Sequence, residues 1–109
     1  MMNREVEEYL EKYSEDVVAM FQSIRQLLME EQIISDERIW ARIPSYYSGD
    51  NFVRLILFKD HINIEANAII QHKDELKGYK ITPKGMLQIF TNQDIPYDVL
   101  RQAFAETLA

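Results

Sequence analysis

The spacing of apolar residues along the first third of the chain predicts two helices. Val6, Tyr9, Leu10 and Tyr13 lie at positions i, i+3, i+4 and i+7, on one side of a short first helix. Ser14 is a favourable N-cap with acidic residues directly after it, so we expect a second helix to begin there. The apolar stripe of this second helix contains Val17, Met20, Phe21, Ile24, Leu27 and Leu28.

After residue 36 the apolar positions recur with a period of two, which is the period of a β-strand. In residues 38–43 apolar positions alternate with Arg38, Trp40 and Arg42, and we expect Pro44 to end this strand. Residues 48–51 predict a turn. Residues 52–58 and 61–66 then predict two strands joined by Lys59 and Asp60.

The register of this predicted hairpin follows from its side chains. A two-residue link places apolar residues opposite one another on one face, and these pairs are Leu57 with Ile62, Leu55 with Ile64, and Val53 with Ala66. The other face would pair Phe58 with His61, Ile56 with Asn63, and Arg54 with Glu65. Because the last pair carries opposite charges, both faces favour the same register.

The last third of the chain predicts two helices and a strand. Residues 68–76 indicate a short helix, and residues 86–90 indicate a final strand. Asp94, or alternatively Ile95, would cap a closing helix with Pro96 in its first turn, whose buried side would contain Val99, Leu100, Ala103 and Phe104. We therefore expect one domain over residues 1–109 with an α+β fold, in which N-terminal helices and a C-terminal helix pack against an antiparallel sheet.

Composition and charge narrow the possible functions. The chain has no cysteine, which excludes disulfides and thiolate chemistry. Its net charge is −6, and residues 1–37 hold ten acidic and three basic side chains. Because no basic cluster is present to neutralise phosphates, we expect no nucleic-acid partner. The longest apolar runs are far shorter than the roughly 18 residues that span a bilayer, so we expect no membrane association and a cytoplasmic location.

Several segments, taken in order, resemble the YdhG-like domains, a family of small bacterial proteins. VEEYL at residues 6–10 and FQSIRQL at residues 21–27 resemble the two N-terminal helices of the family. IWARIPSY at residues 39–46 resembles its proline-containing strand, and KDHINI at residues 59–64 resembles the strand that follows. LKGY, KGMLQI and IPYDVL at residues 76–79, 84–89 and 95–100 resemble its C-terminal part, whereas the acidic residues in DERIW at 36–40 are shifted by one position.

Part of that family is described as frataxin-like iron chaperones, so the resemblance implies iron binding on an acidic surface and delivery to an iron-acceptor protein. The residues of this chain that fit such a surface are Glu7, Glu8, Glu11, Glu15 and Asp16. The first three lie within about 100° of arc on the first predicted helix, and hard cations bind carboxylate oxygens. An ordinary solvated helix face would have the same pattern, so both interpretations stay open.

The mixed face of the predicted sheet offers a second candidate site. Arginine binds carboxylates and phosphates through paired hydrogen bonds, and aromatic residues supply apolar walls. The residues proposed for an anionic small molecule are Trp40, Arg42, Tyr46, Arg54 and His61. A third possibility is a protein-interaction adaptor. No catalytic motif with a supporting arrangement is present, so we expect a binding domain rather than an enzyme.

Overall fold

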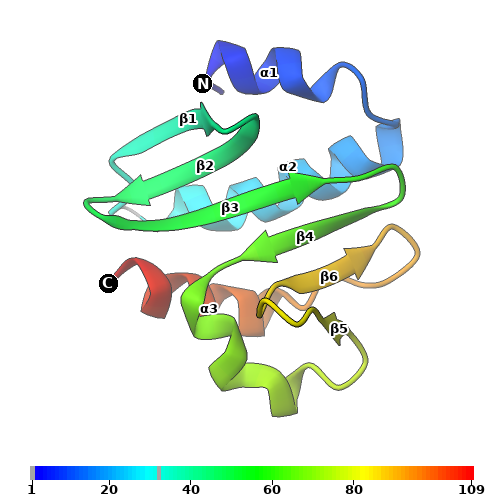
Figure 1. Cartoon of the computed structure of the whole chain (residues 1–109), viewed down its shortest axis with the longest axis vertical. Helices are drawn as coiled ribbons and strands as arrows, with labels where there is room; N and C mark the ends of the chain where they lie inside the picture. The colour runs from blue at the N-terminus through cyan, green and yellow to red at the C-terminus, as the bar shows by residue number, and fades with distance from the viewer. Residues whose placement is uncertain (1, 32) are drawn as a thin grey trace.

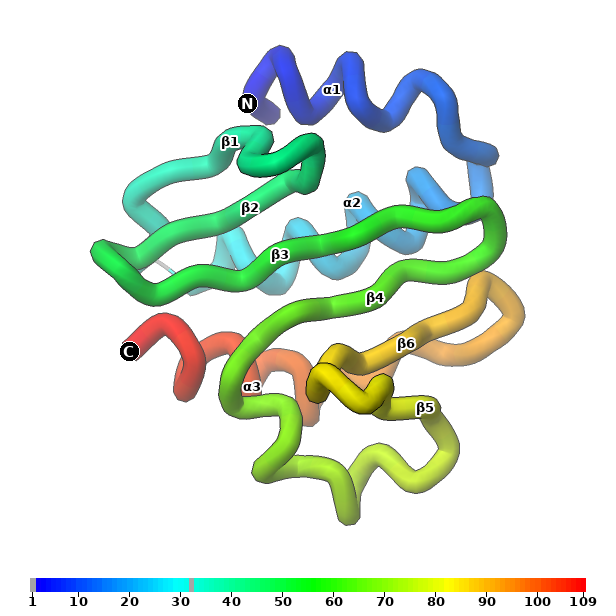
Figure 2. The backbone as a smooth tube through the Cα atoms, viewed as in Figure 1, coloured from blue at the N-terminus to red at the C-terminus, as the bar shows by residue number. Residues whose placement is uncertain are grey.

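A computed structural model describes residues 2–31 and 33–109. Figures 1 and 2 show one sheet with the helices gathered behind it and along one of its edges. The helices are α1 (Arg4–Leu10), α2 (Glu15–Glu30), the 3₁₀ helix η1 (Asn67–Glu75) and α3 (Tyr97–Leu108). The strands are β1 (Asp36–Trp40), β2 (Ile43–Ser48), β3 (Asn51–Leu57), β4 (His61–Glu65), β5 (Lys80–Ile81) and β6 (Leu87–Phe90). The expected α+β fold is confirmed.

All neighbouring strands of the sheet are antiparallel, in the order β1-β2-β3-β4-β6-β5. The predicted hairpin has the expected register, with Leu57 opposite Ile62 and Arg54 opposite Glu65. Its link is also confirmed, because Phe58 N–H donates to the carbonyl of His61 across Lys59 and Asp60.

The strand predicted for residues 38–43 is wrong, because the chain reverses within it. β1 ends at Trp40, and Ala41 and Arg42 form a two-residue turn at φ angles of 51° and 67°. Both residues lie in the left-handed region that tight hairpin turns require, although neither is the glycine or asparagine that usually occupies it. Pro44 therefore lies inside β2. The pairing of β2 with β3 ends at Ser45 and Arg54, so the missing N–H of Pro44 interrupts no pair on that side.

Two other expectations near the C-terminus need correction. Pro96 is the residue that caps α3, so it lies outside the helix and Asp94 does not cap it. Asp94 instead accepts a hydrogen bond at its carbonyl from the hydroxyl of Tyr79. The two-residue strand β5 was not expected at all, and it extends the sheet beyond β6.

The two faces of the sheet have different surroundings. On the covered face, α2 and α3 pack against the central strands, and the fully buried side chains there include Leu55, Ile62, Ile64, Leu87 and Ile89. These residues form one hydrophobic core with Phe21 and Ile24 of α2 and with Leu100 and Phe104 of α3. Burial of this apolar surface is the main stabilising contribution to the fold.

The opposite side of the sheet, which we name the open face, is turned toward the viewer in Figure 1, and no helix crosses it there. Residues opposite one another in register share a face, so its composition follows from the pairing. It contains Arg38, Trp40, Ser45, Tyr47, Phe52, Arg54, Ile56, His61, Asn63, Glu65, Gln88 and Phe90. Within the described residues, no helix has both the length and the hydropathy needed to cross a bilayer.

Candidate functional site

Arg54 is the centre of the open face. Its guanidinium carbon lies 3.7 Å from the ring centre of Phe52 and 4.0 Å from that of Trp40. Its Nε donates to the hydroxyl of Ser45 at 3.2 Å, and its Nη1 lies 3.6 Å from a carboxylate oxygen of Glu65. The side chain is only 10% exposed. Arg54 is therefore an ordered cation whose contacts come from its own strand and from three other strands of the sheet.

A second arginine on the same face is more accessible. The guanidinium of Arg38 lies 4.4 Å from the ring centre of Tyr47, and its Nε lies 3.2 Å from Asp36. The Arg38 side chain is 54% exposed. Trp40, two residues further along β1, is 50% exposed. Together these two side chains present a cation and an aromatic ring to solvent.

Tyr47 joins the two arginines. Burial raises the pKa of its hydroxyl, but hydrogen bonds from Arg54 and Arg38 outweigh burial and bring the pKa below its usual value of 10. Both guanidinium groups therefore favour the ionised form of this hydroxyl, and that of Arg38 lies over the Tyr47 ring. The same arrangement stabilises negative charge from any source, because arginine remains a cation at every physiological pH.

The other end of the open face carries an aromatic stack. The ring of His61 lies parallel to that of Phe58 at 4.4 Å and tilted against that of Phe90 at 4.8 Å. Its Nδ1 lies 2.8 Å from a carboxylate oxygen of Asp60. His61 thus belongs to the open face, as predicted, but it lies within an aromatic stack away from the arginines.

Two of the predicted ligand-binding residues do not share this face. Arg42 lies in the β1–β2 turn and is exposed at the end of the hairpin, because the strand that would have placed it on the face does not continue to it. Tyr46 points to the covered face and is fully buried. Tyr46 therefore does not line the predicted binding face, and its neighbour Tyr47 lies on the open face instead.

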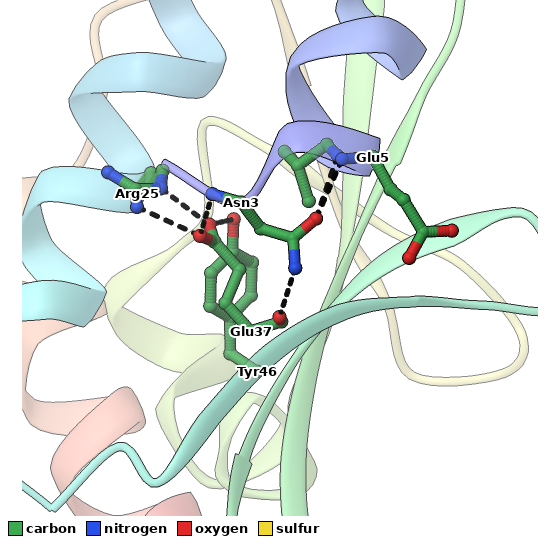
Figure 3. A network of polar contacts seen from close by, with 6 residues as sticks. Asn3, Glu5, Arg25, Glu37 and Tyr46 are labelled. Carbon is green, nitrogen blue, oxygen red and sulfur yellow. Dashed lines mark hydrogen bonds and ion pairs between the residues drawn. The ribbon is translucent and has the colours of Figure 1, made fainter. Parts of the chain in front are cut away.

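Figure 3 shows that Tyr46 belongs to a network of polar contacts around Glu37, which is partly buried. The hydroxyl of Tyr46 donates to Glu37 at 2.7 Å, and Arg25 of α2 donates to the same carboxylate from Nε at 2.6 Å and from Nη2 at 3.0 Å. Asn3 donates its backbone N–H to this carboxylate at 2.8 Å and its side-chain amide to the Glu37 carbonyl at 3.0 Å. The network joins the start of α1 to α2, β1 and β2.

The pKa shifts of Glu37 and Tyr46 indicate that this network has a structural role. Burial alone raises the pKa of Glu37, but the hydrogen bonds from Arg25, Asn3 and Tyr46 lower it further than burial raises it. For Tyr46, burial and the bond to Glu37 both raise the pKa of the hydroxyl. Glu37 is therefore held as a carboxylate and Tyr46 as a neutral donor, and each is already used by the fold.

The predicted metal-binding residues are all exposed. Glu7, Glu8 and Glu11 lie on the outer side of α1, and Glu15 and Asp16 lie in the first turn of α2. Glu8 pairs with Arg4 at 3.5 Å, and Glu7 and Glu11 border a shallow groove between α1 and α2. Among residues 2–31 and 33–109, no group of three or more acidic or histidine side chains is arranged to hold a metal ion. Iron binding here stays a prediction.

Sequence reasoning missed Tyr47 and Glu37 as central residues. Tyr47 could have been found only with the correct position of β2, since a shift of one residue exchanges Tyr46 and Tyr47 between faces. Glu37 has no local signal, because its partners Asn3, Arg25 and Tyr46 come from three other elements.

Comparisons of the chain with protein-family models, curated proteins and solved structures found no match. The resemblance to the YdhG-like domains therefore stays a prediction, and the function must be argued from the geometry.

Proposed function

We propose that this domain binds an anionic small molecule on the open face, at the end where β1, β2 and β3 meet. The observation that supports this most is that Arg38 and Arg54 lie on the same face, with their guanidinium groups against the rings of Tyr47, Trp40 and Phe52. Arginines ordered by aromatic rings lose less conformational freedom on binding a carboxylate or phosphate than mobile ones do.

The arginines have different tasks in this proposal. Arg54 is almost buried and already pairs with Glu65, so it supplies a fixed positive field and holds Trp40 in place. Arg38 is half exposed and can exchange Asp36 for a ligand carboxylate. Arg42 at the adjacent turn adds a further exposed cation, and this local charge contrasts with the net charge of −6 of the chain.

Trp40 suggests the chemical character of the rest of the ligand. Its indole is half exposed beside the arginines, which suits a flat apolar group attached to the anion. A planar aromatic carboxylate satisfies both requirements. Because the site is a sheet surface with little enclosure, we expect weak affinity for a small probe, at about millimolar dissociation constants.

The test is a titration of the ¹⁵N-labelled protein with benzoate, with acetate and inorganic phosphate as smaller anions. We expect saturable shift changes at Arg38, Trp40 and Tyr47, and stronger binding of benzoate than of acetate. Arg38→Gln should weaken benzoate binding about fivefold to tenfold, because one charge-assisted hydrogen bond is lost.

Arg101→Gln is the matched control. Arg101 is 50% exposed and pairs with Asp98 at 3.3 Å, much as Arg38 is 54% exposed and pairs with Asp36 at 3.2 Å. It lies on α3, away from the open face, so its replacement should leave binding unchanged. Equal effects of the two variants, or no saturable shifts on the open face, would disprove the proposal. In the second case a protein partner of the same face becomes the next candidate.

Iron binding by the acidic side of α1 is supported only by the family resemblance. An anaerobic Fe(II) titration of the same sample, with Mg(II) as control, tests it directly. Shifts confined to residues 7–16 that are absent with Mg(II), and that disappear when Glu7, Glu8 and Glu11 are replaced by Gln, would favour the chaperone function. Identical shifts with both ions would identify the acidic side as a solvated surface.

A further inference from the structure

The 3₁₀ helix η1 packs on α3 through a small set of contacts that includes a histidine. Ile69 is fully buried, and the backbone N–H of Ala68 donates to the hydroxyl of Thr107 on α3 at 3.0 Å. His72, which is 8% exposed, also reaches α3. η1 has no side-chain cap at its start, so these contacts with α3 are among those that hold it in place.

Both nitrogen atoms of the His72 ring face carboxylates. Nδ1 lies 2.8 Å from Glu75 in η1 itself, and Nε2 lies 2.7 Å from Glu106 in α3. The two carboxylates approach opposite sides of one ring. The imidazole therefore connects two elements that are 34 residues apart in the chain.

Whether both contacts can be hydrogen bonds depends on the protonation state of the His72 ring. An ionised carboxylate only accepts hydrogen bonds, and a neutral imidazole has one N–H donor and one bare nitrogen. Neutral His72 can therefore donate to Glu75 or to Glu106, and the other contact then places a lone pair against a carboxylate. Only the imidazolium donates to both residues at once.

We infer that His72 is a proton-dependent clamp that holds η1 on α3, closed when the ring is an imidazolium and loosened when the ring is neutral. The charged groups that face the ring are Glu75 from η1 and Glu106 from α3. Lys73 and Asp74, its sequence neighbours, are exposed, and neither belongs to an ion pair within the described residues. The balance of charge around the ring is therefore negative and favours its protonation.

Hydrogen bonds from Glu75 and Glu106 raise the pKa of His72 above its usual 6.5, against the opposing effect of burial. A pKa that is higher in the folded state means that the clamp contributes fully to stability below about pH 6.5, the value for an unfolded chain. This contribution decreases as the pH rises through the folded-state pKa. The clamp therefore opens toward alkaline pH.

The clamp has a local consequence for a groove beside η1. Asn67 and Ile70 of η1 form one wall of this groove of about 390 Å³, and residues 82–85 of the β5–β6 connection form the other. Movement of η1 away from α3 changes the first wall only. We expect the width of this groove to depend on pH.

The first experiment measures the ring protons of His72 by NMR between pH 5 and 9, with His72→Gln used to assign its signals. We expect a midpoint above 6.5 that falls in Glu106→Gln. Glu30→Gln is the matched control, because Glu30 is 46% exposed and Glu106 is 48% exposed, and Glu30 does not contact His72. A midpoint at or below 6.5 that neither variant changes would disprove the clamp.

The second experiment separates a switch from a purely structural histidine. Hydrogen exchange of the Ala68 amide, corrected for its intrinsic pH dependence, should lose protection roughly fivefold between pH 6 and pH 8.5, as one hydrogen bond is lost. The central amide of Ile64 should not change. His72→Lys keeps a cation over this range and should remove the pH dependence at Ala68. Protection of Ala68 that is constant with pH in the unchanged chain would overturn the inference, even if His72 titrates as expected.

Discussion

Tyr46 and Tyr47 are neighbours in β2, yet the two faces of the sheet give them opposite environments. Tyr46 is fully buried and donates to a carboxylate, whereas Tyr47 is partly exposed and lies beneath a guanidinium. The same contrast separates Glu37 from Arg38 in β1. Glu37 is enclosed by three donors, and Arg38 has one acidic partner and free surface.

This difference shows which polar groups the fold has already used. On the covered face the carboxylate of Glu37 is paired with Arg25, Asn3 and Tyr46, and no buried side-chain nitrogen or oxygen of the described residues lacks a partner, so these groups stabilise the packing of helices on the sheet. On the open face the aromatic and cationic groups are ordered but only partly covered. Partly covered and ordered groups can bind a ligand without a large cost in conformational entropy.

The largest difference in the free energy of unfolding should appear between alanine variants of two neighbouring aliphatic residues, one on each face. Leu55 is fully buried among α2 and α3, so Leu55→Ala should lower the free energy of unfolding by about 3 kcal/mol through lost contacts and a cavity. Ile56, the next residue, lies on the open face and is only partly buried. Ile56→Ala should cost about 1 kcal/mol. Urea unfolding measures both, and equal losses would contradict the assignment of faces.

An intermediate effect should come from Glu37→Gln. Arg25 would keep its charge in a site where its side chain is only 17% exposed, so the free energy of unfolding should fall by about 2 kcal/mol at pH 7. Arg38→Gln, an exposed change one residue away, should alter it by less than about 0.5 kcal/mol.

Glu37→Gln should also change how the stability of the protein depends on acid pH. The pKa of Glu37 is lower in the folded state, so its contribution is present above the unfolded value of about 4.3 and is lost as pH falls through the folded-state pKa. Thermal unfolding from pH 7 to pH 2 should therefore show less acid destabilisation in Glu37→Gln than in the unchanged chain. Parallel curves for the two proteins would show that Glu37 does not contribute to acid unfolding.

Arg38→Gln should have the smallest effect on stability. It should nevertheless have a specific effect on the ionisation of Tyr47. Arg38 helps to bring the pKa of Tyr47 below 10, so this variant should raise the titration midpoint of Tyr47. Absorbance at about 295 nm against pH measures it, and Tyr47→Phe identifies the transition. If the midpoint does not move, Arg38 and Tyr47 do not interact as described.

The sequence predicted the β3–β4 hairpin in full register because two independent signals agreed there. Apolar residues matched across one face, and Arg54 matched Glu65 across the other. It could not predict the β1–β2 turn, because Ala41 and Arg42 lack the glycine or asparagine that usually marks positive φ angles. Pro44 also suggested the end of a strand, whereas β2 includes Pro44 and continues to Ser48.

The candidate site was predicted only in part, because the β1–β2 turn was not recognised. Trp40, Arg54 and His61 were assigned to one face correctly, because they depend on alternation within β1 and on the hairpin. Arg42 was misplaced because it lies in the unrecognised turn, and Tyr46 because it lies beyond that turn. The fit of Arg54 between Trp40 and Phe52 depends on the order of three strands, which no local pattern contains.

Asn3 has a consequence for the behaviour of the protein at high concentration. By binding the Glu37 carbonyl, it covers part of the outer edge of β1, the strand at one end of the sheet. Uncovered edge strands recruit strands from other molecules and start aggregation. Loss of α1 would therefore expose this edge to self-association, in addition to removing Val6 and Leu10 from the core.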